Sequence, residues 1–384
     1  MEFASMKVII NPLLPVKQCG FITQIEPILS VHDDLYLRLA LIKNNENILI
    51  YASLDNIGIS EAQALEFKAL VRKKYGENAA LLVSCTHTHF GGDPKDENYA
   101  IQLGEAFKLA LETAHPKDVG EISFGYRCRD YAEVGKSRIS GHKANVRLET
   151  FSLYAENRRI ATFVIHNVHP TIMPASTPYF SAEYPGALLK MCSIGCPGEF
   201  ISFMQGADGD ISTRFTRLEQ TYEEVRRLAT MLHEKIEEMM NEEVILKPLD
   251  FIVDETTIPL VHQFMDPQKH VQGENLSERE QETIEYGRIV LEKMKTNAHL
   301  LPATLTITRV RFPGYTQLFV QNELFSEYLE TLPKGKASLI CYTTGYRPYV
   351  AGLRPVRLTY ELFSDTLNLA SKESLYKTLC DLSN

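Results

Sequence analysis

The sequence lacks several features that would place the chain in a familiar class at once. Its seven cysteines are an odd, scattered set without a Cys-x-x-Cys pair, so neither a disulfide framework nor a thiolate zinc cluster is expected. Its longest apolar runs, such as 79–83 and 160–165, have the length of a strand, far short of the ~20 residues of a membrane span. We therefore expect no transmembrane segment and a cytoplasmic protein.

The chain also has no excess of positive charge. Its 40 basic and 49 acidic residues give a net charge of −9, and the basic residues are scattered, so we expect no nucleic-acid partner. Apolar residues make up 44% of the 384 positions, which is enough for a buried core. Residues 1–20 contain Pro12 and Pro15 and no cleavage site, so we interpret them as part of the fold rather than a signal peptide.

Strand-like and helix-like segments alternate without a repeat, a low-complexity tract or a Gly/Ser linker. We expect strands at 47–54, 80–85, 121–124, 146–154, 160–166, 200–204, 304–310, 317–321 and 337–342. We expect helices at 60–75, 98–114, 216–240 and 276–295; the first and last have the capping boxes Ser60-x-x-Gln63 and Ser277-x-x-Glu280. This pattern predicts one large α/β domain, residues 1–384, with a mixed β-sheet and flanking helices; 263–275 is expected to be a loop.

The strongest local signal is a pair of histidines at the end of an apolar strand. His87 and His89 alternate along the chain, so both imidazoles can face one metal ion or one substrate. Gly91 and Gly92 follow and allow the backbone to turn sharply, which is typical of a ligand site at the carboxyl edge of a sheet. A metallo-β-lactamase-type pattern would need Asp-His at these two glycine positions, so that class is not favoured.

Two further segments leave apolar strands through polar residues. His166 and His169 follow the apolar run 162–165. Taken alone, the pair could equally be one core histidine and one surface histidine. Residues 203–212 pass through glycines and acidic residues to Ser212, which could be an ordinary helix cap.

Taken together, these motifs resemble the catalytic domain of the neutral/alkaline ceramidase family. The matching segments are THTHFGG (86–92), HPTIM (169–173), SAEYPG (181–186) and GDIS (209–212). Residues 31–42 and 53–58 resemble the family's early strands, and 314–329 and 341–350 resemble its late metal-binding segments. The resemblance covers most of the chain, and we expect no counterpart of the C-terminal immunoglobulin-like domain of long ceramidases.

The resemblance implies a zinc-dependent amidase that cleaves the N-acyl bond of ceramide. It implies that Zn²⁺ is held by His87, His169, Glu323 and Tyr349. It places His89, Ser212 and Arg138 beside the metal as catalytic or substrate-binding residues, with Ser212 either attacking directly or holding the water or oxyanion. Asp55 and Asp210 are predicted to fix the histidine tautomers.

The chain also departs from the family pattern. Gln321-Asn322-Glu323 replaces Pro-Gly-Glu, and Thr213-Arg214 replaces the Pro-Asn that follows the family serine. The substrate could therefore be a sphingolipid or a smaller N-acyl compound. The alternatives are a zinc esterase or other carbonyl hydrolase acting on a small cytosolic substrate, and a catalytically silent homologue that binds a ligand.

Overall fold

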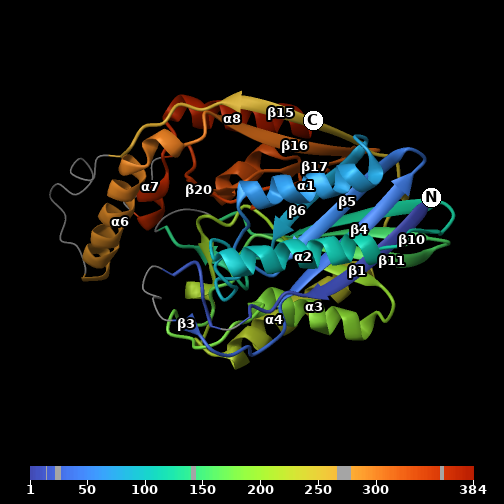
Figure 1. Cartoon of the computed structure of the whole chain (residues 1–384), viewed down its shortest axis with the longest axis horizontal. Helices are drawn as coiled ribbons and strands as arrows, with labels where there is room; N and C mark the ends of the chain where they lie inside the picture. Colours follow the sequence, from blue (N-terminus) through green and yellow to red (C-terminus); the bar gives the residue numbers. More distant parts are fainter. Residues whose placement is uncertain (14, 22–26, 140–143, 266–277, 355–358) are drawn as a thin grey trace.

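The computed structural model describes residues 1–13, 15–21, 27–139, 144–265, 278–354 and 359–384. It confirms the expected α/β class, with several mixed sheets and helices on their outer faces (Figure 1). None of the described helices combines the length and the apolar character needed to cross a membrane.

The first sheet has five strands in the order β6-β5-β4-β1-β7. They are β1 (Glu2–Ile9), β4 (Tyr36–Asn44), β5 (Asn47–Leu54), β6 (Ala79–Cys85) and β7 (Lys117–Asp118). Strands β5 and β6 are parallel, and α1 (Glu61–Tyr75) connects them behind the predicted Ser60 capping box. Helices α1 and α2 (Glu97–Thr113) cover one face of this sheet.

The second sheet also has five strands, in the order β12-β11-β10-β8-β14. They are β8 (Ile122–Asp130), β10 (Arg147–Ala155), β11 (Arg158–His166), β12 (Phe200–Gln205) and β14 (Lys247–Pro248). Strands β11 and β12 are parallel and are connected by α3 (Glu183–Gly195). Helix α3 packs against β12 and against α4 (Tyr222–Met240).

A third sheet of four strands and several short elements complete the fold. The sheet has the order β15-β16-β17-β19, formed by β15 (Ile252–Pro259), β16 (Thr304–Phe312), β17 (Tyr315–Phe319) and β19 (Ala337–Ile340). Two-stranded pairs are β2 (Val16–Lys17) with β3 (Pro27–Ile28), β9 (Lys136–Ser137) with β13 (Ile211–Ser212), and β18 (Asn322–Leu324) with β20 (Arg347–Val350). The remaining helices are α6 (Glu278–Thr296), α7 (Tyr360–Ser364), α8 (Leu369–Ser383) and the 3₁₀ turns Thr213–Phe215, Ala298–Leu300 and Ser326–Thr331.

The central strands are apolar on both faces because each face packs on a different layer. In β4, Leu39 and Leu41 belong to the apolar cluster that includes α1 and α2, whereas Ala40 and Ile42 belong to the cluster between the three large sheets. Burial on both sides explains why such strands have continuous apolar runs rather than an alternating pattern.

The carboxyl ends of the parallel strands meet at one edge, and this edge positions the candidate site. The backbone N–H of Cys341, just after β19, donates to Gln205 O at the end of β12 (2.9 Å), and Gly206 N donates to His166 O at the end of β11 (2.9 Å). Thr344 N donates to Val83 O of β6 (2.9 Å). Segments from all three large sheets therefore converge where ligands bind in open α/β sheets.

Several predicted boundaries differ from the structure. Helix α4 begins at Tyr222 behind a Thr221 cap, rather than at 216, because Thr213–Phe215 forms a separate 3₁₀ turn. The sequence did not predict α3, α8, β1 or β15. Part of the predicted 263–275 loop and the Ser277-x-x-Glu280 box lie outside the residues whose side chains the structure describes.

Candidate metal centre

His87 lies directly after β6, in a backbone conformation that points its ring into the protein. Its φ angle is 63°, uncommon for a residue other than glycine, and its side chain is fully buried. The ring Nδ1 lies 2.8 Å from Ile57 O. A carbonyl oxygen can only accept, so Nδ1 has the proton and Nε2 presents a lone pair in the neutral ring.

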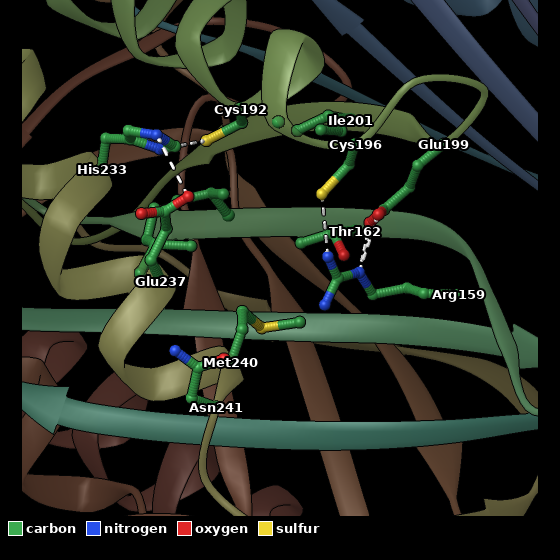
Figure 2. A pocket seen from close by; sticks show the side chains of 13 residues that line it. Arg159, Thr162, Cys192, Cys196, Glu199, Ile201, His233, Glu237, Met240 and Asn241 are labelled. Atoms are coloured by element: carbon green, nitrogen blue, oxygen red, sulfur yellow. Dashed lines mark hydrogen bonds and ion pairs between the residues drawn. The ribbon is translucent and has the colours of Figure 1, made fainter.

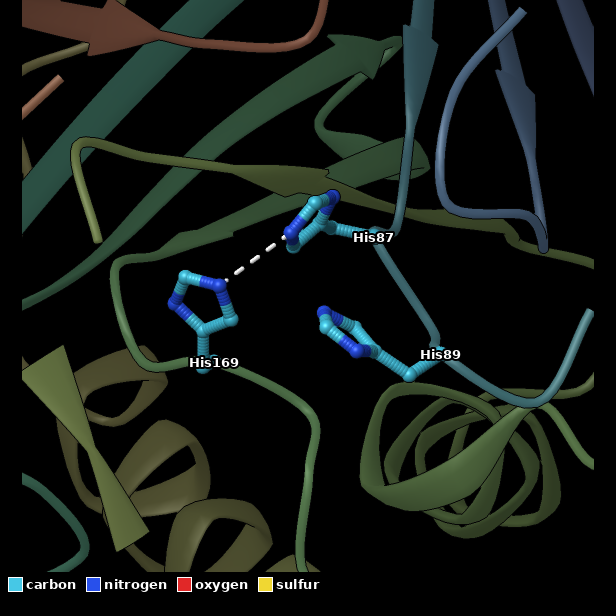
Figure 3. Close-up of side chains that lie close together, drawn as sticks. All are labelled: His87, His89 and His169. Atoms are coloured by element: carbon cyan, nitrogen blue, oxygen red, sulfur yellow. Dashed lines mark hydrogen bonds between the residues drawn. The ribbon is translucent and has the colours of Figure 1, made fainter. Parts of the chain in front are cut away.

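His169 follows β11 and faces His87. Its Nδ1 lies 2.9 Å from Asp208 O and 3.0 Å from Asp208 Oδ2, so this nitrogen is also a donor. The two Nε2 atoms are 3.2 Å apart, as the dashed line in Figure 3 marks. Two neutral rings of this tautomer would direct lone pairs at each other, so the pair needs a proton or a cation between the two nitrogens.

Glu323 of β18 directs a carboxylate oxygen at the same point. Its Oε2 is 3.7 Å from His87 Nε2 and 3.5 Å from His169 Nε2, and it is buried without a hydrogen-bond donor in the described part of the chain. Ligand atoms ~2.0–2.1 Å from a tetrahedral zinc ion lie ~3.3 Å from one another. The spacing of these three atoms and the unpartnered oxygen therefore fit a shared divalent cation.

His89 is the third histidine of the cluster. Ligand nitrogens of His87, His89 and His169 all lie within 4.8 Å of one another, so the three could hold a metal ion together. Neither ring nitrogen of His89 has a well-formed hydrogen bond to a described residue, and the ring packs edge-on against Phe21 with centroids 4.9 Å apart. Burial lowers the pKa of His89 well below its usual value, which favours the neutral ring.

The electrostatics of the cluster follow from burial opposed by neighbouring charges. Burial lowers the pKa of both His87 and His169, but at His169 the neighbouring Asp208 and Glu323 carboxylates together outweigh it and raise that pKa to about 9. Burial alone would raise the pKa of Glu323, but the neighbouring imidazoles lower it, so the group stays a carboxylate.

Three polar residues that the sequence analysis did not single out, Asp208, Tyr342 and Tyr346, support the ligand candidates. Tyr346 donates its hydroxyl to Glu323 Oε1, and Tyr342 donates to Asp208 Oδ1. Tyr342 also stacks on His87, with centroids 3.8 Å apart.

The predicted roles of Asp55 and Asp210 are wrong. Asp55 instead accepts two hydrogen bonds from Arg38, and Asp210 accepts from Ser326, whereas Asp208 contacts the His169 ring.

The structure also brings the remaining predicted residues to this edge. Ser212 forms a backbone bridge with His169, and its Oγ accepts from Arg214 N at 3.0 Å. The guanidinium of Arg138 lies 5.9 Å above the Tyr349 ring and 3.3 Å from Glu361. Tyr349 stacks on His169 with centroids 6.4 Å apart and pairs with Glu323 across β18 and β20.

The turn Ser181–Tyr184 at the start of α3 holds both histidine segments. Thr88 Oγ1, between the two histidines of the first motif, donates to Ser181 O at 2.9 Å. The buried Glu183 carboxylate accepts from Ile172 N and Met173 N, which follow His169, and Tyr184 donates to Val168 O. The SAEYPG motif thus connects the segments that contain His87 and His169.

Solved structures share the fold of this chain, which is a neutral ceramidase-like fold. The crystal structure of neutral ceramidase from Pseudomonas aeruginosa matches with a TM-score of 0.77 at 13% identity, over 100% of this chain and 74% of that one. A ceramidase complexed with C2 matches with a TM-score of 0.76, also at 13% identity and with the same coverage of both chains. No protein-family model and no curated protein sequence matches the chain.

Proposed function

We propose that this chain is a zinc-dependent hydrolase that cleaves an N-acyl amide bond, and that residues 1–384 form one catalytic unit. The observation that supports it most is the convergence of His87 Nε2, His169 Nε2 and Glu323 Oε2, with separations of 3.2, 3.5 and 3.7 Å. Tyr349 is proposed as the fourth ligand. The ceramidase-like fold supports an amide as the scissile bond.

The donor set suits zinc because imidazole and carboxylate are its ordinary ligands. These residues would hold Zn²⁺, which would supply polarisation of a carbonyl oxygen and a water whose pKa is lowered to ~7, a nucleophile at neutral pH. Asp208 and Ile57 O hold the two Nδ1–H groups, so both rings would present their Nε2 lone pairs to a bound ion.

The neighbouring side chains are proposed to move protons and to orient the substrate. His89 is neutral and has a free nitrogen, so it can take a proton from the attacking group and give it to the leaving amine. Ser212 is joined to the His169 segment by a backbone bridge, and its hydroxyl is proposed to donate to the developing oxyanion or to attack directly. Arg138 keeps its charge beside Glu361 and Tyr349 and can orient a polar group of the substrate.

Paired amide and ester substrates test the bond that is cleaved. We expect the zinc-loaded protein to hydrolyse a short-chain N-acyl amide with a higher kcat/KM than the matched ester. A preference for the ester would favour the esterase alternative, and the absence of turnover on both would favour the ligand-binding alternative.

Variants of the two proton-handling residues test the mechanism. His89→Ala and Ser212→Ala should each retain zinc but lower kcat at least ~100-fold, the scale of a lost proton-transfer or oxyanion group. Zinc loss in His89→Ala would make His89 a ligand, and unchanged turnover in Ser212→Ala would remove Ser212 from the mechanism.

A further inference from the structure

A cavity of about 310 Å³ lies between α3, α4 and the second sheet, and none of its lining residues belongs to the histidine cluster. Two free thiols from the last turn of α3, Cys192 and Cys196, line it together. Figure 2 shows that each thiol is directed at a different partner on the cavity wall. This arrangement gives the two thiols different chemistry.

Cys196 faces a cation. Its Sγ lies 3.0 Å from Arg159 NH2, and the same guanidinium is held in place by the Glu199 carboxylate at 2.7 and 2.8 Å. The guanidinium is thus fixed beside a half-buried sulfur, where its N–H groups can also donate to the oxygen that leaves when that sulfur attacks a peroxide.

Cys192 faces a base. Its Sγ lies 3.5 Å from His233 Nδ1, and the opposite ring nitrogen, Nε2, lies 3.5 Å from Glu237 Oε1. The carboxylate favours the tautomer in which Nδ1 accepts the thiol proton. Burial raises the pKa of the Cys192 thiol to about 12, so this thiol stays protonated until a base removes its proton.

The spacing of the two cysteines permits a bond between them. Cys196 N donates to Cys192 O at 3.1 Å, so the two residues are one helical turn apart. Residues four apart in a helix have Cα atoms ~6 Å apart, within the ~4.4–6.8 Å range of disulfides, and Cβ atoms ~5–6 Å apart, which must approach to ~3.5–4.5 Å for the bond to form. Cys196 is the C-cap of α3, with a non-helical backbone (φ −132°, ψ 68°), so a change of these angles can bring the two Cβ atoms together without breaking the helix.

We propose that Cys192 and Cys196 are a redox-active pair that is oxidised to a disulfide by hydroperoxides. The Cys196 thiolate attacks the peroxide, the O–O bond breaks, and Cys196 becomes a sulfenic acid while an alkoxide or hydroxide leaves. His233 then takes the proton of Cys192, whose thiolate attacks the sulfenic sulfur. The S–S bond forms, and the departing hydroxide receives that proton and leaves as water.

Peptide mass spectrometry tests this proposal on the full-length protein. The reduced chain is exposed to hydrogen peroxide for increasing times, the remaining thiols are blocked with N-ethylmaleimide, and trypsin is added. Residues 191–214 contain both cysteines without an internal Lys or Arg, so the disulfide appears as one unlabelled peptide that has lost two hydrogen atoms. Half-buried Cys380 on α8 is the internal control.

We expect the Cys192–Cys196 disulfide to form at least about ten times faster than Cys380 is oxidised, because Cys196 Sγ has a guanidinium beside it and a second thiol one helical turn away. In Cys192→Ser, Cys196 should accumulate as a sulfenic acid that dimedone traps; in Cys196→Ser, Cys192 should stay reduced. Cys380→Ser should behave as the wild type. Oxidation of both thiols no faster than Cys380, or fast oxidation of Cys192 in Cys196→Ser, would overturn the proposal.

Discussion

Asp208 contacts the candidate metal centre directly, whereas Asp55 and Asp210, the carboxylates that the sequence analysis named for this role, do not. Its side chain meets His169 Nδ1 at 3.0 Å and accepts hydrogen bonds from Tyr342 and Gln205. It lies two residues before Asp210, whose carboxylate is directed at Ser326 instead. Two acidic residues of one motif therefore have different roles.

This difference gives a prediction for metal affinity. Asp208→Asn removes the charge that fixes the ring of His169, and such a loss typically weakens metal binding by about 10–100-fold. Competition with a chromophoric chelator measures the zinc affinity. Asp210→Asn is the matched control and should keep an affinity near that of the wild type. Equal losses in the two variants would contradict the assignment of Asp208.

A second prediction concerns His166, which is buried three residues before His169. Its Nδ1 lies 2.7 Å from Arg147 O, and burial lowers its pKa to about 4. The unfolded chain takes up a proton near pH 6.5 and the folded chain only near 4, so stability is lost as the pH falls through this interval.

We expect the metal-free wild type to lose up to about 3 kcal/mol of unfolding free energy from this group between pH 6.5 and 4. His166→Asn keeps a donor for Arg147 O and should lose correspondingly less over the same interval. Urea unfolding at several pH values measures the difference, with surface His299→Asn as the control. If the unfolding free energy of the wild type and that of His166→Asn fall equally between pH 6.5 and 4, the prediction is wrong.

At the scale of elements, the site depends on how closely the segment after β12 approaches β18. Gly209 N donates to Leu324 O at 2.8 Å, and a Cβ at Gly209 would lie 2.9 Å from Leu324 O and 3.0 Å from Glu323 O. Both close atoms are backbone atoms and cannot rotate away. Glycine at this position therefore lets Asp208 and Glu323 approach the same point.

We predict that Gly209→Ala costs about 1–3 kcal/mol of stability, the usual cost of overpacking, and also weakens zinc binding by displacing β18. Thermal unfolding and a chelator competition measure the two effects. Gly104→Ala in α2 is the control, because its Cβ would meet only the flexible end of Glu66 at 3.4 Å and alanine favours helix. Unchanged zinc binding in Gly209→Ala would show that β18 is not held in this way.

The sequence indicated the candidate metal ligands better than it indicated the side chains that hold those ligands in place. His87 and His169 could be found because each follows an apolar strand, and their motifs resemble a known family. The contacts of Asp208, Tyr342 and Tyr346 could not be found, because they join side chains from different sheets and depend on how the sheets pack. Helix α3 was missed because Pro185, Gly186 and Gly195 weaken its helical pattern.

At the scale of the whole molecule, net charge bears on how a lipid substrate would be reached. The chain has a net charge of −9. A basic residue near an anionic membrane contributes roughly 1 kcal/mol to binding, so an acidic chain is attracted weakly. We predict a higher kcat/KM for a short-chain amide in solution than for long-chain ceramide in anionic vesicles. Faster hydrolysis of the vesicle substrate, together with co-sedimentation of the protein, would reverse this conclusion.

The central claim is that one zinc ion, held by His87, His169 and Glu323, supports amide hydrolysis. The most direct measurement is a titration of the metal-free protein with zinc in which bound metal and amidase activity are recorded together. We predict that both rise in parallel and saturate at about one zinc per chain, and that Glu323→Gln and His169→Ala bind zinc far more weakly. Amide hydrolysis that is unchanged without metal, or full zinc occupancy in His169→Ala, would contradict the claim.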